Sequence, residues 1–458
     1  MQAPLRSLLR PSSLTSCVIV AATLALSSST LGCAGHEGRT VKMRSALDAG
    51  DPHRAIREIN KQLDVESDEQ LPKKIEGDDA LLVLDRATIQ LAVTSFANSK
   101  RDFEAADKAI EMVDLSHSAG DEIAKFVFSD SAGRYSAPPH EKLLINTLNM
   151  VNYLELGDLS GARVEARRLG VMQSYYRDTI KRDNPILGFS GFLAGFVFEK
   201  SGDPNEALRW YDEALKFSAA SSLKRSVAAL APLGTYKSPR IDALAAVSEE
   251  APPDPNEGEI VVVMGYGRVP HKIAQRVPIG LALTYTAGAL SPTDAAAANR
   301  LAAQGLVTWV NYPELAPEQG AYELPSLAVD GRRTSLEQAV DISAEVRTAW
   351  QEIQGKVVAS AITRMISRVA VGAGIQAASG RDSITGLLLS LGTQAAMTAA
   401  DTPDTRSWET LPARVAVSRV RVPAGRHRVL VSGRGVSRDQ PVDVAPGGWV
   451  LVSLLALR

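Results

Sequence analysis

The chain has 458 residues, of which 45% are hydrophobic and 5% aromatic, and its 50 lysines and arginines nearly balance its 52 aspartates and glutamates. This length and apolar content predict a globular protein of two or three domains. The balanced charge argues against nucleic acid as the main partner, because phosphate binding needs a surplus of basic residues.

The first 33 residues have the features of a bacterial export signal. Arg6 and Arg10 form a basic start, an uncharged apolar run covers residues 14–26, and small residues lead to Cys33. The run is shorter than the about 20 residues that a stable membrane span needs. We therefore predict a signal peptide over residues 1–32 that is cleaved before Cys33.

The residues Thr30 to Cys33 resemble the lipobox of bacterial lipoproteins, with Thr30 where leucine is usual. The resemblance implies that Cys33 carries acyl chains such as palmitate and anchors the protein to a membrane through a short tether, residues 33–38. The alternative is an ordinary signal peptide with a chance cysteine at the cut. Ala34, not aspartate, follows Cys33, so the outer membrane, facing the periplasm, is the expected location. Loss of Cys17 with the signal would leave no disulfide.

The next part of the chain has a helical pattern, in which a short unit recurs at residues 50–55, 102–106, 157–162 and 202–207. Glycine suits the end of one helix, aspartate caps the next, and alanine allows two helices to pack closely. The last copy resembles half of a tetratricopeptide repeat (TPR). We predict an N-terminal α-helical TPR-like solenoid over residues 39–235. The spacing of 45 to 56 residues differs from the regular 34 or so, and a generic helical bundle is the alternative.

A proline- and acid-rich segment predicts a linker over residues 236–258, followed by a smaller α/β domain over residues 259–458. This domain is expected to begin with a buried strand at 259–264, to have a second short strand at 306–310, and to include a long helix from Ser335 to about Ala378.

The last part of the sequence contains one apolar stretch and several strand patterns. We interpret residues 384–400 as a buried helix rather than a membrane span, because the stretch contains glutamine, glycine and threonine. Strands at 414–422, 426–431 and 449–455 predict an antiparallel β meander at the end of the chain. The predicted fold class is α+β.

Several motifs resemble those of a family of uncharacterised bacterial lipoproteins with TPR-like helices. They include His140-Glu141-Lys142-Leu143, the VEARR sequence at 164–168 and the DTPDTRSWETLP sequence at 401–412. The resemblance spans most of the chain after the signal and implies no assigned catalytic role. The family's genes tend to lie beside those of small lipoproteins, which implies a role in envelope or cell-wall assembly.

The DTPDTRSWETLP motif supplies the candidate site residues Asp404, Arg406 and Trp408. In one interpretation their role is structural: Arg406 holds a loop through Asp404, and Trp408 fills a pocket between helix and sheet. In the other they form a recognition surface, because tryptophan and arginine are frequent at binding hot spots.

The sequence contains no local motif for catalysis, metal binding or phosphate binding. The six histidines have no metal-ligand spacing, and neither a nucleophile elbow nor a phosphate loop is present. The one local pair is His140-Glu141, for which a capped helix start is the simpler interpretation. We expect no enzyme activity, no cofactor and no metal.

The predicted function is therefore that of a lipid-anchored periplasmic scaffold or adaptor, which binds another cell-envelope protein through its helices. The alternatives are a cell-wall-acting enzyme and a sensor of a small molecule or glycan.

Overall fold

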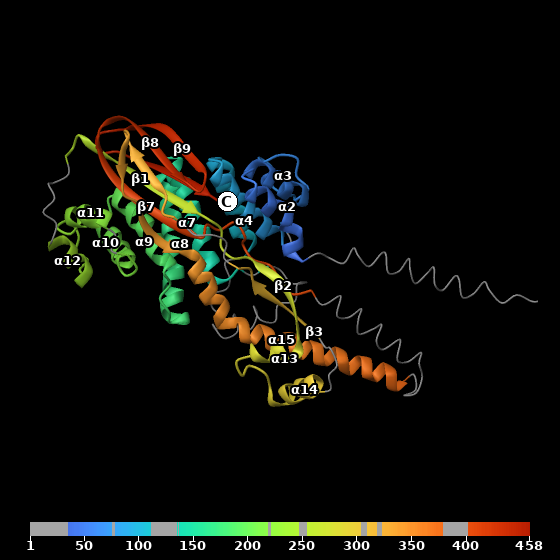
Figure 1. The fold of residues 1–458 in the computed structure, drawn as a ribbon. Coiled ribbons are helices and arrows are strands. Elements are labelled where there is room, and N and C mark those ends of the chain that lie inside the picture. Colours follow the sequence, from blue (N-terminus) through green and yellow to red (C-terminus); the bar gives the residue numbers. More distant parts are fainter. Residues whose placement is uncertain are drawn as a thin grey trace, which may run out of the picture.

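The computed structural model describes residues 35–75, 78–110, 135, 137–218, 221–246, 254–303, 309–317, 323–378 and 402–458. The predicted signal peptide, Cys33 and the apolar stretch 384–400 lie outside these residues. The fold is mixed α and β, with helices in the first half of the chain and β sheets in the second, as predicted (Figure 1).

The first half consists of consecutive helices, most of which pack against the next helix in the chain. Their bounds are α2 His36–Asp48, α3 Pro52–Gln62, α4 Asp79–Ala92, α5 Phe96–Ala109, α7 Pro139–Glu155, α8 Leu159–Tyr175, the π-helical turn η2 Tyr176–Ile180, α9 Ile186–Lys200, α10 Pro204–Leu215, the 3-10 turn η3 Ser221–Leu223, α11 Lys224–Leu230 and α12 Pro239–Ala246. Helix α2 begins inside the segment predicted as a tether, and α12 lies inside the segment predicted as a linker.

Three of the four recurrent units connect two helices as predicted. Their glycines have positive φ angles of 76°, 70° and 75°, and the aspartate that follows each glycine caps the next helix by accepting a backbone N–H three residues ahead: these are Gly50-Asp51, Gly157-Asp158 and Gly202-Asp203. The unit at 102–106 lies in the middle of α5 instead, where Asp102 is fully buried and pairs with Arg86 at 2.6 Å. The prediction of a helix boundary there was wrong, because this aspartate neutralises a buried guanidinium.

The second half contains three sheets and a long helix. The elements are β1 Glu257–Tyr266, β2 Lys272–Pro278, α13 Ile279–Thr284, α14 Pro292–Ala303, β3 Trp309–Leu315, β4 Ser326–Val329, β5 Arg332–Thr334, β6 Glu337–Asp341, α15 Ile342–Ala378, β7 Arg414–Pro423, β8 Gly425–Gly433, β9 Val436–Val444 and β10 Trp449–Ala456. One four-stranded sheet has the order β10-β1-β7-β6 and the other β5-β4-β8-β9, while β2 and β3 form a pair.

The terminal strands do not form the predicted meander. β8 and β9 pair with each other in the second sheet, whereas β10 pairs in parallel with β1 in the first sheet. The residue composition of β10 explains this position. Its sequence WVLVSLLA is apolar on both faces and needs cover on both sides, which the first sheet offers and a strand beside the half-exposed β9 would lack. The helix predicted from Ser335 is also shorter, because residues 337–341 pair with β7 as strand β6.

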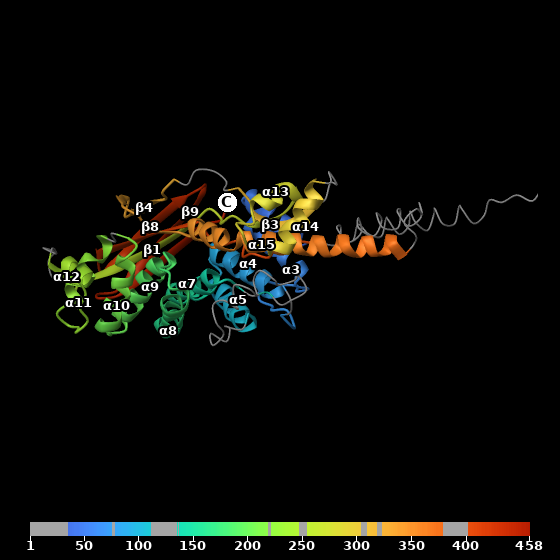
Figure 2. The same ribbon diagram turned by 90° about the horizontal axis from the view of Figure 1, so that it is seen from below.

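The first sheet is the middle of three layers. Alternate residues of β1 point to opposite faces: Val261 and Val263 belong to the core shared with the helices, and Ile260, Val262 and Met264 to the core shared with the second sheet. Figure 2 shows the helices α7–α12 on one side of β1 and the strands β4, β8 and β9 on the other. Helices and first sheet therefore share one hydrophobic core rather than forming two separate cores joined by a linker.

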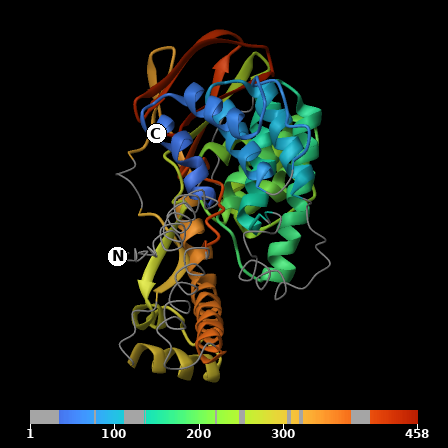
Figure 3. The ribbon, with the colours of Figure 1, turned by 90° about the vertical axis from the view of Figure 1, so that its right-hand side faces the viewer.

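Helix α15 extends from this body as an arm. Strands β2 and β3 and helices α13 and α14 lie along it (Figure 3), and they share a small core with it. That core includes Ile279, Ala298, Tyr312, Val358 and Ile362. At the base of the arm, Glu345 accepts hydrogen bonds from Arg182 at 2.5 Å and from Asn184 at 3.1 Å, which fixes the start of α15 against the helical layer.

Candidate functional site

The predicted site residues lie in the segment 402–413, which has little regular secondary structure and packs against the helices. Asp404 and Arg406 form the predicted pair: Nε and Nη2 of Arg406 donate to the two carboxylate oxygens of Asp404, each at 2.8 Å. A further nitrogen, Nη1, donates to Asp78 at 3.2 Å. Burial acts to raise the pKa of Asp404, but Arg406 and Lys272 hold it below its ordinary value. Arg406 thus fastens its own loop to the start of α4.

Trp408 lies in the interior, with 1% of its surface exposed. Its indole N–H is within hydrogen-bonding distance of the hydroxyl oxygens of Thr88, at 3.1 Å, and Thr410, at 3.2 Å. Its ring meets the ring of Phe103 edge-on, with centroids 5.8 Å apart. In this structure neither Trp408 nor the side chain of Arg406, which is 3% exposed, offers a surface to another molecule.

Two buried carboxyl groups hold the backbone of the same segment. Glu141, on α7, accepts the backbone N–H of Trp408 at 3.2 Å with Oε1 and the hydroxyl of Tyr135 with Oε2. Asp85, on α4, accepts the backbone N–H groups of Glu409 and Thr410, both at 3.1 Å. A carboxyl group in the middle of an apolar helix is the sequence signal for such a role, and for Asp85 our sequence interpretation missed it.

The pair His140-Glu141 is buried at the start of α7. Burial, together with the charges of Lys272 and Arg182, lowers the pKa of His140 to about 3, so the imidazole is neutral over the physiological range. Both oxygens of Glu141 are occupied by the hydrogen bonds described above. The arrangement is that of a carboxyl group that positions a loop.

Further ionisable groups extend this buried cluster towards α2. Glu409 accepts a hydrogen bond from Arg44 at 2.6 Å, and burial nevertheless raises the pKa of Glu409 to about 7. The Nε2 atom of His36 lies 4.0 Å from Asp85, and burial lowers the pKa of His36 to about 3. Within the described part of the chain, no group of three or more histidine, cysteine, aspartate or glutamate side chains is arranged to hold a metal ion. The cluster joins α2, α4, α7 and segment 402–413 into one unit.

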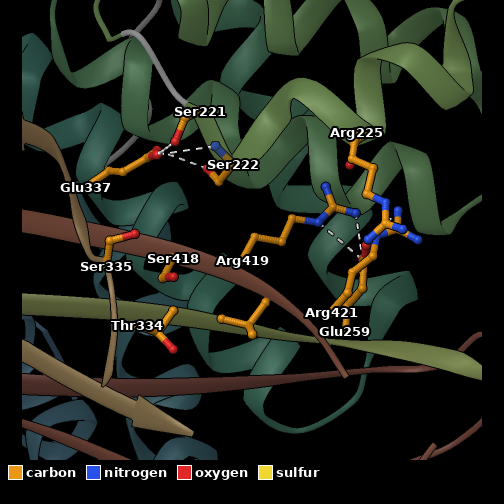
Figure 4. Close-up of a pocket in the computed structure, with 12 residues that line it drawn as sticks. Ser221, Ser222, Arg225, Glu259, Thr334, Ser335, Glu337, Ser418, Arg419 and Arg421 are labelled. Carbon is orange, nitrogen blue, oxygen red and sulfur yellow. Dashed lines mark hydrogen bonds and ion pairs between the residues drawn. The ribbon is translucent and has the colours of Figure 1, made fainter. Parts of the chain in front are cut away.

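A separate polar cavity of about 340 Å³ lies between η3, α11, the first sheet and the loop that joins β5 to β6 (Figure 4). Its lining residues are Ser221, Ser222, Arg225, Ser226, Glu259, Thr334, Ser335, Glu337, Ser418, Arg419, Val420 and Arg421. None of these was predicted as a site residue. They come from four distant parts of the chain, which strand pairing and the packing of η3 against β7 bring together.

Among the helices that the structure describes, none has both the length and the apolar character that crossing a bilayer requires. No protein-family model, curated protein or solved structure matches this chain.

Proposed function

We propose that the protein is a lipid-anchored scaffold or adaptor of the bacterial cell envelope. In this proposal Cys33 holds it at the outer membrane, facing the periplasm, and a TPR-like array of helix pairs binds another envelope protein during cell-wall or envelope assembly. The observation that carries the proposal is the series of helix pairs α2–α3, α4–α5, α7–α8 and α9–α10, with contacts between successive pairs. Such stacked pairs usually serve to bind proteins.

The inner side of this array is already occupied by the protein itself. Helices α4, α7 and α9 are buried along nearly their whole length, and each contacts the first sheet. A partner must therefore bind elsewhere, and the outer helices α3, α5, α8 and α10 are the part of the array that remains.

Helix α8 offers apolar surface on that outer side. Val164 and Val171 are each 49% exposed and lie seven residues apart, which places them on the same side of the helix. The opposite side holds α8 on α7, where Glu165 accepts hydrogen bonds from Asn146 at 2.9 Å and from Asn149 at 3.2 Å. Burial of exposed apolar side chains such as these valines is favourable. We therefore assign the partner contact to this surface of α8.

Photo-crosslinking from α8 in intact cells tests the proposal. A photoreactive amino acid at Val164 or Val171 should give a crosslink to one reproducible envelope protein. The same residue at Leu430, which is 39% exposed on the second sheet, serves as the control and should give no such product. The absence of a product from both α8 positions, or the same products from all three positions, would contradict the adaptor function. Deletion of the helices is unsuitable, because it would remove most of the shared core.

The lipid anchor has its own test. Mass spectrometry of the mature N-terminal peptide should find diacylglycerol on Cys33, and Cys33→Ala should block both lipidation and cleavage at this site. An unmodified N-terminus elsewhere would indicate an ordinary signal peptide.

Of the alternatives, a cell-wall-acting enzyme gains no support from His140 and Glu141, which are buried and engaged in the fold. A ligand sensor gains support from the polar cavity.

A further inference from the structure

The cavity of Figure 4 has a lining that differs from that of a typical small-molecule site. Such sites are mostly apolar and aromatic, whereas here Val420 is the one apolar residue among the twelve that line the cavity. Six of the others carry hydroxyl groups, namely Ser221, Ser222, Ser226, Thr334, Ser335 and Ser418. A hydroxyl group can both donate and accept a hydrogen bond, so this lining suits a ligand that is itself rich in hydroxyl groups.

The charged residues other than Glu337 are concentrated towards one end of the cavity. Figure 4 shows Arg225, Arg421 and Glu259 together on one side, and Ser335, Ser418 and Thr334 on the other. The ion-pair network at that end contains Arg419, Arg421 and Lys200 against Glu199 and Glu259, a surplus of one positive charge. This surplus suits a ligand with one anionic group.

Arg419 and Arg421 differ in how far their guanidinium groups are engaged by the protein itself. Arg419 has a buried side chain and donates to both oxygens of Glu199, at 3.0 and 2.5 Å, and to Glu259 at 2.6 Å, so its guanidinium is committed to the fold. Arg421 has a 16% exposed side chain, and its Nη2 lies 3.1 Å from one oxygen of Glu259. A guanidinium has five N–H donors in a planar fork. Arg421 therefore keeps donors for a second carboxylate or a phosphate.

The other end is shaped by Glu337. Its carboxylate accepts hydrogen bonds from the hydroxyls of Ser221 and Ser222 and from the backbone N–H of Ser222 at 3.3 Å. These bonds fasten η3 to β6 across the cavity. Ser335, in the loop beside it, is exposed. The cavity is thus held open by contacts that leave Ser335 and Arg421 available at its two ends.

We propose that this cavity binds a small saccharide that carries one carboxylate or phosphate group, with the anionic group on Arg421 and the sugar hydroxyls on Ser335 and its neighbours. The volume of about 340 Å³ lies near the lower end of the roughly 300–1,000 Å³ found for ligand sites, which suits one or two sugar rings. This site is independent of the partner surface on α8.

Calorimetric titration of the full-length protein, purified in detergent, with glucuronate, glucose 6-phosphate and glucose tests the proposal. Glucuronate and glucose share a ring but differ by the charged group. At least one of the two anionic sugars should bind at least about tenfold more tightly than glucose, and the tighter one identifies the group. Equal affinity for all three sugars, or no saturable binding of any, would overturn the proposal. Inorganic phosphate that binds as tightly as glucose 6-phosphate would overturn its saccharide part.

Three variants, of which Arg426→Gln is the control, test whether the sugars bind in this cavity. Arg421→Gln should lose the roughly tenfold preference for the anionic sugar, whereas Arg426→Gln, the same change at an exposed position on β8, should keep it. Circular dichroism and the urea midpoint of both variants report whether they fold. Because Arg421 also contacts Glu259, Ser335→Ala provides a second measurement, in which all three sugars should bind about threefold or more weakly while the preference for the anion is kept. A folded Arg421→Gln protein with unchanged preference would contradict the assignment.

Discussion

One oxygen of Asp85, Oδ1, accepts hydrogen bonds from both the backbone N–H and the side-chain hydroxyl of Thr410, at 3.1 and 2.9 Å, across 325 residues of sequence. Asp85 lies on α4, and Thr410 lies just before β7. This contact joins the helical layer to the segment that leads into the first sheet. The two halves of the chain are therefore held together by specific polar bonds inside their common apolar core.

Replacement of Asp85 by alanine should destabilise the protein by about 3 kcal/mol or more, because three buried donors would lose their acceptor. Asp85→Asn should cost less than about 1 kcal/mol. Burial and the neighbouring Glu409 raise the pKa of Asp85 and favour its uncharged form, and asparagine keeps the accepting oxygen. Urea unfolding measures both variants, with the exposed Asp443→Ala as the control. Equal losses for Asp85→Ala and Asp85→Asn would show that charge, not the accepting oxygen, matters.

Trp408→Ala should destabilise the protein by about 3–5 kcal/mol, the usual range for removal of a buried aromatic ring. Trp408→Phe should lose about 1–2 kcal/mol, because the indole N–H bonds to Thr88 and Thr410 disappear while most of the packing remains. Thermal unfolding measures the difference. The partly buried Trp309 provides a comparison: Trp309→Phe should have the smaller effect. If Trp408→Ala left stability unchanged, the tryptophan would not be part of the folded core.

The neutral His140 makes stability depend on pH. Its pKa is about 3 in the folded protein, against an ordinary value of 6.5, so between these values the unfolded chain binds a proton that the folded protein does not. Stability then falls as the pH falls. Relative to His140→Leu, the native protein should lose about 1.4 kcal/mol per pH unit below pH 6. Urea unfolding from pH 8 to pH 4 measures this loss, and above pH 7.5 the difference between the two proteins should be constant. Parallel curves over the whole range would disprove the shift.

The pair α9–α10 should not tolerate a side chain at Gly191. A Cβ atom there would lie 2.8 Å from the backbone oxygen of Trp210, so Gly191→Ala must push the two helices apart and should cost about 1–3 kcal/mol. Gly170, inside α8, is the matched control, because a Cβ atom there has its nearest neighbour at 3.9 Å. Gly170→Ala should stabilise the protein by about 0.5–1 kcal/mol through helix propensity. Thermal unfolding of the two variants should therefore move in opposite directions.

The sequence predicted local structure better than it predicted assembly. The capped turns at Gly50, Gly157 and Gly202 could be recognised because each depends on residues within one turn of the chain. The strand at 259–264 was recognised from its continuous apolar run, and the structure confirms it as part of β1, covered on both faces.

Features that depend on distant partners could not be predicted in the same way. The parallel position of β10 beside β1 depends on which strand covers which core, and Asp102 resembles a capping residue until its partner Arg86 is known. For the candidate site, Asp404 and Arg406 are two residues apart and their pairing follows from the sequence. The carboxyl groups that hold the same loop, Glu141 and Asp85, come from two different helices, and the loop that they hold could be identified only from the fold.

The position of His36 limits the distance between the folded protein and a lipid on Cys33. Helix α2 begins at this buried residue, only three residues after Cys33, and three residues extend at most about 10 Å. A lipid on Cys33 would therefore hold the folded body close to the bilayer, because the connecting segment is too short to let the body move far from it. In the proposed function, the distance from the membrane at which the protein could bind a partner would then be limited by the dimensions of its own folded body.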